Sequence, residues 1–152
     1  MTILEATRND LLSILELQKV CYWQEAEIYD DFVIPPLTQT LASITHDFEQ
    51  QVILKAESEK TIVGSVRGYL EGETCKIGRL IVHQDFQNKG VGSQLMNAIE
   101  TQFPEARRYE LFTGHLSAKN LYLYKKLGYA AFRQERVNNR LELVFLEKKN
   151  DQ

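Results

Sequence analysis

A short run of residues between a predicted strand and a predicted helix has the composition of an anion-binding site. The strand ends with Leu80-Ile81-Val82, and Gln87-Asn88-Lys89-Gly90-Val91-Gly92-Ser93 leads from a loop into the first turn of the helix. The first N–H groups of a helix have no partner within it and lie at the positive end of its dipole. Gly90 and Gly92 leave room for an anion to approach these groups, and Lys89 adds a positive charge. The segment therefore predicts a binding site for a phosphate or pyrophosphate.

Three alternatives compete with this interpretation. An isolated pair of glycines more often only starts a helix, so the motif by itself is weak evidence. A Walker loop needs four residues between its glycines and then Gly-Lys-Ser/Thr, which this segment lacks. A dinucleotide-binding fingerprint needs a third glycine, but Leu95 stands at that position. The Walker and dinucleotide sites are therefore disfavoured.

The elements that position this segment alternate between strands and helices. Residues 52–56, 61–70 and 74–82 predict three strands, and their short connections predict an antiparallel meander. The second of these strands is expected to bend at Gly64 and Gly68. The other expected elements are a strand over residues 2–6, a helix capped by Asn9 or Asp10, a helix capped by Thr38, a helix over residues 90–103, a strand over residues 109–113, a helix over residues 117–127 capped by Ser117, a strand from Tyr129, a positive-φ turn at Asn138-Asn139 and a strand over residues 141–148.

Two blocks of the sequence together resemble the GNAT superfamily of N-acetyltransferases. The residues from Gln87 to Gly92 match the family signature Q/R-x-x-G-x-G/A, and Leu80-Ile81-Val82 stands where the acyl-CoA-binding strand of the family ends. The second block, from Asn120 to Tyr129, is similar to the family segment N…LY-x-K-x-G-[FY]. The resemblance covers nearly all 152 residues. It implies one N-acetyltransferase domain over residues 1–152, with a mixed α/β fold whose mostly antiparallel sheet of about seven strands is flanked by about four helices and splayed at the acyl-CoA site.

The resemblance also implies a cofactor and roles for individual residues. Acetyl-CoA is the expected co-substrate, with no metal. Its pyrophosphate would bind the backbone N–H groups of residues 88–93, and its pantetheine arm would lie along the strand that ends at Val82. An unpaired N–H of Ile81 or Val82 would stabilise the oxyanion of the thioester, a contribution on the order of 3 kcal/mol. Asn120 would contact the cofactor, and Tyr124 would be the general acid for the departing thiolate.

Tyr124 also has a purely structural explanation. It could pack in the core beside Leu121 and Leu127 of the same predicted helix. A phenol with a pKa of about 10 is protonated at neutral pH, as a general acid must be. Tyr122, two positions earlier, lies on a different face of the helix and is the nearest decoy.

The base that deprotonates the amine is left open by the sequence. Some family members carry a glutamate on the strand before the signature, but Lys76 stands at about that position here. Glu25, Glu71 and Glu73 are candidates by composition only. The amine must be neutral to attack, so either a water chain or an acceptor of low pKa would be needed otherwise.

Residues 22–32 combine aromatic rings with carboxylates and suit a cationic amine, although a solvated acidic helix end explains them as well. Arg67 and Tyr69 share one face of a strand and could line the same cleft. The expected acceptor is a small-molecule amine or the amine of a peptide or protein. Peptide N-termini, lysines, polyamines and antibiotic-like amines all remain open.

Composition excludes several other classes of protein. The net charge is −3, and 26% of the residues are charged, so binding to nucleic acid or to an acidic membrane surface is not favoured. No apolar run is long enough to span a bilayer, and no signal segment opens the chain. Cys21 and Cys75 lack metal-type spacing, as do the three histidines, which favours a cytoplasmic protein without a metal site.

A non-catalytic acetyl-CoA sensor and a plain interaction module are the alternatives to an enzyme. The last strands could supply a homodimer interface.

Overall fold

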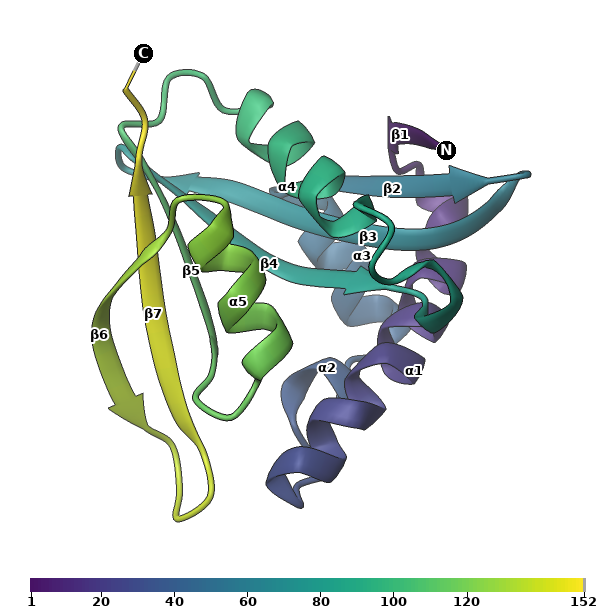
Figure 1. Ribbon diagram of the computed structural model, residues 1–152. Helices are drawn as coiled ribbons and strands as arrows, with labels where there is room; N and C mark the ends of the chain where they lie inside the picture. The colour runs from purple at the N-terminus through teal and green to yellow at the C-terminus, as the bar shows by residue number, and fades with distance from the viewer. Residues whose placement is uncertain (152) are drawn as a thin grey trace.

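The computed structural model describes residues 1–151, which form five helices and a seven-stranded sheet. Figure 1 shows the sheet running through the molecule with helices on both of its faces. The elements in chain order are β1 (Thr2–Glu5), α1 (Leu11–Tyr29), α2 (Pro35–Thr38), α3 (Leu41–Gln50), β2 (Val52–Ser58), β3 (Thr61–Glu71), β4 (Thr74–Val82), α4 (Val91–Thr101), β5 (Arg108–Gly114), α5 (Ala118–Lys126), β6 (Ala130–Arg136) and β7 (Glu142–Lys149).

The strands lie in the order β1-β2-β3-β4-β5-β7-β6. All neighbouring strands are antiparallel except β4 and β5, which are parallel. The predicted meander of β2, β3 and β4 is confirmed, and β4 has the predicted bounds. The sheet is therefore the mixed, mostly antiparallel one that the sequence predicted.

Two hydrophobic cores hold the helices to the sheet. The larger core joins α4 and α5 to one face, and the smaller one joins α1 and α3 to the other. The apolar stripe of α4, with Val91, Leu95 and Ile99 almost fully buried, is the one that its four-residue spacing predicted. Within residues 1–151, none of the helices has the length and hydropathy that crossing a bilayer requires.

The glycines of β3 allow α4 to lie close to the sheet. A Cβ atom at Gly64 would be 3.0 Å from the side chain of Leu95, and one at Gly68 would be 3.2 Å from the side chain of Ile99. These approaches are tighter than ordinary van der Waals contact. The two glycines that the sequence marks as bends of the strand thus also serve helix packing.

One predicted helix cap is wrong, and another stands at the predicted residue but makes no capping hydrogen bond. Thr40 caps α3, since its hydroxyl oxygen accepts the N–H of Ser43 at 3.1 Å, whereas Thr38 is already the last residue of α2. Asp10 is the residue before α1, as predicted, but its carboxylate accepts the N–H of Thr7 at 2.7 Å, in the turn before the helix, instead of an N–H of α1. In both cases an additional short turn precedes the helix, which hydrophobic periodicity does not reveal.

The connection between β6 and β7 also differs from the prediction. Neither Asn138 nor Asn139 has a positive φ. Instead, the side-chain oxygen of Asn138 accepts the N–H groups of Arg140 and Leu141, at 2.8 and 3.0 Å. The side chain of asparagine can close a turn in this way without a left-handed backbone.

Candidate active site

A cleft opens where β4 and β5 separate. The two strands pair only over Thr74, Cys75 and Lys76 of β4, and beyond these residues they diverge, as Figure 1 shows. The cleft has a volume of about 910 Å³ and is lined by residues of α1, the end of β4, the start of α4 and the start of α5. It brings together all the sequence-predicted cofactor-binding residues except Lys89, which borders it through Phe86. The predicted splay of the sheet is therefore confirmed.

A β-bulge shapes the β4 wall of this cleft. Arg79 and Leu80 together stand opposite a single residue of β3, Val66. Arg79 adopts a φ of +51°. Such a left-handed conformation costs a residue other than glycine about 1–2 kcal/mol. Bulges are frequent next to active sites, where they redirect a strand.

The backbone alternation after the bulge shows which N–H faces the cleft. The N–H of His83 donates to the carbonyl of Val63 in β3 at 2.7 Å, so Ile81, two residues earlier, also points its backbone groups toward β3. Backbone groups of neighbouring residues in a strand point to opposite sides. Val82 therefore points its backbone groups away from β3, which makes it, of the two predicted oxyanion donors, the one whose N–H is directed to the open side. Ile81 still contributes to the cleft lining.

The carbonyl of Val82 anchors the turn that leads into α4. It accepts a hydrogen bond from Nε2 of Gln87 at 3.1 Å and from the thiol of Cys21 at 3.5 Å. Burial raises the pKa of Cys21 to about 11, against the opposing effect of this hydrogen bond. Cys21 is thus a neutral thiol that packs α1 against β4, and Gln87 fixes the start of the predicted anion site.

Six consecutive backbone N–H groups, those of residues 88–93, have no hydrogen-bond partner within residues 1–151. The first bond of α4 is made by Gln94, whose N–H donates to the carbonyl of Gly90 at 3.0 Å. Asn88 and Gly90 have φ values of +62° and +83°, which turn the chain into the helix. Successive free N–H groups in such a turn form a concave site for an anion. The ammonium of Lys89 lies 5.4 Å from the centre of the Phe86 ring, at the same rim.

The two glycines of the signature have different roles. A Cβ atom at Gly90 would meet nothing within 4 Å, so this glycine is required by its backbone conformation. A Cβ atom at Gly92 would be 3.2 Å from Leu123 of α5 and 3.9 Å from Val82. The prediction that both glycines simply clear a path for the anion is therefore incomplete, because Gly92 also lets α4 approach α5.

Glu25 of α1 connects the two sides of the cleft. Its carboxylate accepts hydrogen bonds from the hydroxyl of Ser117 at 2.7 Å and from Nδ2 of Asn120 at 3.3 Å. Asn120 also donates to the hydroxyl of Thr113 at 3.3 Å. The hydroxyl of Ser117 bonds to that of Tyr29 at 2.8 Å. Ser117 is the residue before α5, as predicted, but its side chain does not cap the helix. The contact was not predictable, because Glu25 and Asn120 are far apart in the sequence.

Tyr124 and Tyr122 occupy different environments on α5. Tyr124 is only 6% exposed, belongs to the larger core and lies edge-on to Tyr129, with ring centres 6.1 Å apart. Burial, followed by the effects of Tyr22 and Glu25, raises the pKa of Tyr124. Tyr122 is 72% exposed and lines the cleft. Tyr124 thus packs as the structural explanation predicts while lying near two residues that line the cleft.

The other carboxylates considered as the base, and the lysine at the position of the family glutamate, lie outside the cleft. Glu71 and Glu73 flank the turn between β3 and β4, where they pair with Lys76 and Arg107 at 3.8 and 3.4 Å. Lys76 makes a closer pair with Glu110 of β5, at 2.6 Å. Of the three carboxylates considered as a base, only Glu25 lies in the cleft.

Only part of the segment over residues 22–32, which was predicted to suit a cationic amine, lines the cleft. Tyr22 and Glu25 line the cleft, whereas Trp23 and Phe32 are exposed and pack on each other with ring centres 4.7 Å apart. Burial raises the pKa of Tyr22 to about 12. The helix continues to Tyr29, so its period of 3.6 residues directs only part of the segment toward the cleft.

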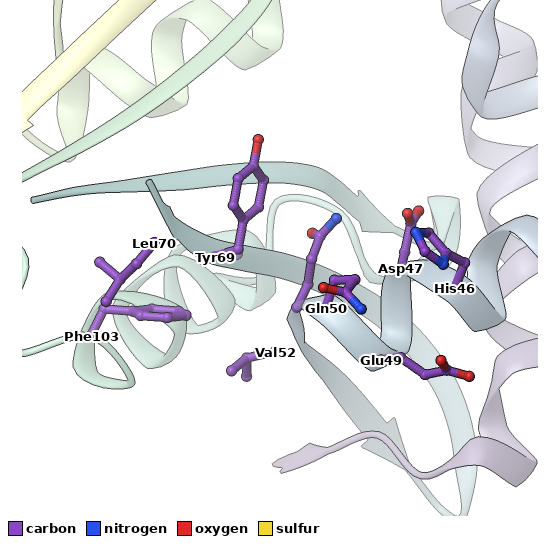
Figure 2. A pocket seen from close by; sticks show the side chains of 10 residues that line it. His46, Asp47, Glu49, Gln50, Val52, Tyr69, Leu70 and Phe103 are labelled. Atoms are coloured by element: carbon purple, nitrogen blue, oxygen red, sulfur yellow. The ribbon is translucent and has the colours of Figure 1, made fainter. Parts of the chain in front are cut away.

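A second hollow, of about 660 Å³, lies away from this cleft. In Figure 2 its rim is formed by His46, Asp47 and Glu49 of α3, by Tyr69 and Leu70 of β3 and by Phe103 after α4. The predicted association of Arg67 with Tyr69 in the acceptor cleft is not observed, because Tyr69 lines this second hollow. Among residues 1–151, no three His, Cys, Asp or Glu side chains gather as metal ligands would.

The geometry agrees with comparisons to known proteins. The model of the acetyltransferase (GNAT) family matches residues 9–129. The chain belongs to this family. The GNAT membership that the two motifs predicted is thus confirmed, and the protein is an acetyltransferase by family. A search of curated proteins finds no match.

Several solved structures share the GNAT fold at low sequence identity. The PaiA N-acetyltransferase of Thermoplasma acidophilum, in complex with coenzyme A, is 16% identical with a TM-score of 0.80, covering 98% of this chain and 99% of its own. The yncA protein of Salmonella typhimurium, solved with acetyl-CoA, is 18% identical with a TM-score of 0.76, covering 100% of this chain and 95% of its own. A ribosomal-protein-alanine N-acetyltransferase of Brucella melitensis is 18% identical with a TM-score of 0.76, covering 98% of this chain and 99% of its own. These similarities confirm the fold of the GNAT chain.

Proposed function

We propose that this GNAT protein transfers the acetyl group of acetyl-CoA to a primary amine by direct attack in a ternary complex. The observation that carries the proposal is the run of six free N–H groups over residues 88–93. It lies beside the end of β4, which is no longer paired with β5. A diphosphate needs several donors at one point, and an extended pantetheine needs an open strand edge. We propose one catalytic domain over residues 1–152, and a cytoplasmic location is supported by the two unpaired cysteines.

The residues of the cleft fit acetyl-CoA in a definite orientation. The N–H groups of residues 88–93 would bind the diphosphate, and Leu80 and Val82 would lie along the pantetheine. The N–H of Val82 would donate to the thioester oxygen as negative charge develops there. Asn120 has its amide oxygen free of hydrogen bonds from residues 1–151 and could accept one from the cofactor. This assignment leaves α1 as the side from which the amine approaches.

Tyr124 supplies the proton for the departing thiolate in this proposal. An ordinary phenol is already protonated at neutral pH, as a donor must be, and burial, which raises the pKa of Tyr124, keeps it in that form. The same burial keeps bulk water from competing for the thiolate. The ring of Tyr124 belongs to the core, and its neighbour Leu123 on α5 lines the cleft.

Glu25 accepts the proton of the amine in this proposal. It is the one carboxylate among the three candidates that lines the cleft, and its two hydrogen bonds hold it across the opening. A positioned carboxylate can collect a proton directly or through one water. Lys76, at the position of the family glutamate, is paired with Glu110 and is unsuited to this step.

The test measures acetyl-CoA binding by calorimetry and thiol release against a panel of amines. We expect Tyr124→Phe to lower kcat by about a hundredfold or more, with the Kd for acetyl-CoA within about twofold of wild type. Tyr122→Phe removes the same hydroxyl from the exposed neighbour and should leave both values unchanged. Equal turnover in Tyr124→Phe would remove this residue from the mechanism. Tight acetyl-CoA binding without thiol release for any amine would instead indicate a sensor.

We also propose that β6 supplies a homodimer interface. This strand is the edge of the sheet, and all seven of its residues are exposed (Figure 1). Free strand edges pair readily with other strands. Light scattering that gives the mass of one chain at micromolar concentration would contradict this proposal.

A further inference from the structure

Arg67 of β3 is a buried cation, and one of its N–H donors makes no hydrogen bond within the described chain. It is 3% exposed, and its Nη1 lies 2.8 Å from the carboxylate of Asp47, while its Nη2 donates to Oε1 of Gln18 at 2.6 Å. Its Nε is the one buried side-chain N or O atom without a hydrogen-bond partner in residues 1–151. Arg67 therefore has a single carboxylate to balance its charge.

Arg79, in the bulge of β4, is a second cation close to the first. Its Nη1 donates to Oε1 of Gln39 at 2.9 Å, and no carboxylate lies within 4 Å of it in the described part of the chain. A guanidinium has five N–H donors, so most of its capacity is uncommitted. Burial and, secondly, the like charge of Arg79 lower the pKa of Arg67 to about 10. Among the described residues, Asp47 pairs with Arg67 alone, so the two cations together have one paired carboxylate and the site has a net positive charge.

The uncommitted guanidinium lies one turn of α1 away from the cleft lining: Oε1 of Gln39, which accepts from Arg79, also accepts from Nε2 of Gln18 at 3.0 Å, and Gln18 precedes Tyr22 by one helical turn. Arg79 directly precedes Leu80, which lines the cleft. Tyr22 and Glu25, which follow Gln18 on α1, both line the cleft. A Cβ atom at Gly78, the neighbour of Arg79, would meet nothing within 4 Å, so the space beside the bulge is open.

The diphosphate of acetyl-CoA does not account for this charge. Its proposed site is the turn before α4, whereas Arg79 contacts Gln39, in the segment between α2 and α3 on the opposite face of the sheet. This is the face of α1, from which the amine approaches. The cation also stands in a left-handed conformation that a glycine would adopt without strain, which is a pattern found at functional sites.

We propose that the acceptor is an amino carboxylate, such as a free amino acid, whose carboxylate binds Arg79 while its amine faces Glu25. The inference rests on the proposed function and adds the substrate class. A guanidinium binds a carboxylate through two parallel N–H donors, which selects it over an uncharged amide. The carboxylate would also balance the excess positive charge that Arg79 and Arg67 create.

The test titrates the CoA-loaded protein by calorimetry with each standard amino acid and with its carboxamide, which keeps the amine and lacks the negative charge. We expect at least one amino acid to bind about tenfold or more tightly than its amide, as one charge-assisted contact provides. Arg79→Gln and Arg79→Gly should reduce that preference to within about twofold. Arg79→Gly also relieves the backbone strain, so a loss shared by both variants comes from the guanidinium.

Arg107→Gln is the matched control, because it makes the same charge change at an exposed pair with Glu73, near the far end of β4. It should keep the full preference for the carboxylate. Equal or absent binding of every amino acid and its amide would overturn the inference, as would a preference that survives in both Arg79 variants. Acetyl-CoA is titrated separately, so failure of the proposed function would appear as lost cofactor binding, whatever the result with amino acids.

Discussion

The backbone at Gly90 provides the sharpest test of the acetyl-CoA site. Gly90 and Gly72 both have positive φ, +83° and +63°, and a Cβ atom at either would meet nothing within 4 Å. Gly90 lies within the run of free N–H groups, just before α4, whereas Gly72 lies in the turn between β3 and β4. Alanine at either position must adopt a left-handed conformation, at a cost of about 1–2 kcal/mol.

The two substitutions should therefore lower the free energy of unfolding by similar amounts but differ in ligand binding. If the turn relaxes in Gly90→Ala, at least one N–H leaves the diphosphate. A hydrogen bond to a charged group contributes about 1.5–3 kcal/mol. Its loss corresponds to about 10- to 150-fold weaker binding of acetyl-CoA. Gly72→Ala should bind acetyl-CoA as wild type does.

Urea unfolding and isothermal titration calorimetry measure the two quantities on the same preparations. The reasoning would be refuted by a Gly90→Ala protein that is destabilised but binds acetyl-CoA with unchanged affinity. It would be refuted equally by a Gly72→Ala protein that loses as much affinity as Gly90→Ala. Either result would mean that the N–H groups of the turn do not hold the diphosphate.

Two further predictions concern the charged groups of the sheet. Asp47→Ala should lower the unfolding free energy by about 3–5 kcal/mol, because it leaves the buried charge of Arg67 unbalanced. Glu49→Ala on the same helix removes an exposed carboxylate and should cost about 0–1 kcal/mol in the same urea titration; equal losses would contradict the burial argument. Burial alone would raise the pKa of Glu110, but hydrogen bonds, first that from Lys76, outweigh it and lower the pKa below 4.5. The stabilisation is therefore present above pH 4.5 and is lost as the pH falls through the folded pKa, so Glu110→Gln should flatten the acid side of a stability-versus-pH curve.

Local patterns predicted the elements well and their caps poorly. The bounds of β4 and the buried stripe of α4 follow from strand alternation, turn residues and four-residue spacing, which act within one segment. The caps at Thr40 and Asp10 depend on the short turns that precede the helices, which leave no periodic signal. Asn138 was recognised as a turn residue, but its side chain rather than its φ closes the turn.

The sequence by itself determined the family, the order of elements and the anion-binding turn, because two motifs and the free N–H groups of a helix start are local properties of the chain. Only the tertiary structure decided that the N–H of Val82, rather than that of Ile81, is directed away from β3, since that depends on the pairing with β3. Only it brought Glu25 to Asn120 and left Arg79 without a carboxylate within 4 Å in the described part of the chain. These relations join segments far apart in the chain, and no local pattern encodes which of them meet when the sheet and its helices pack.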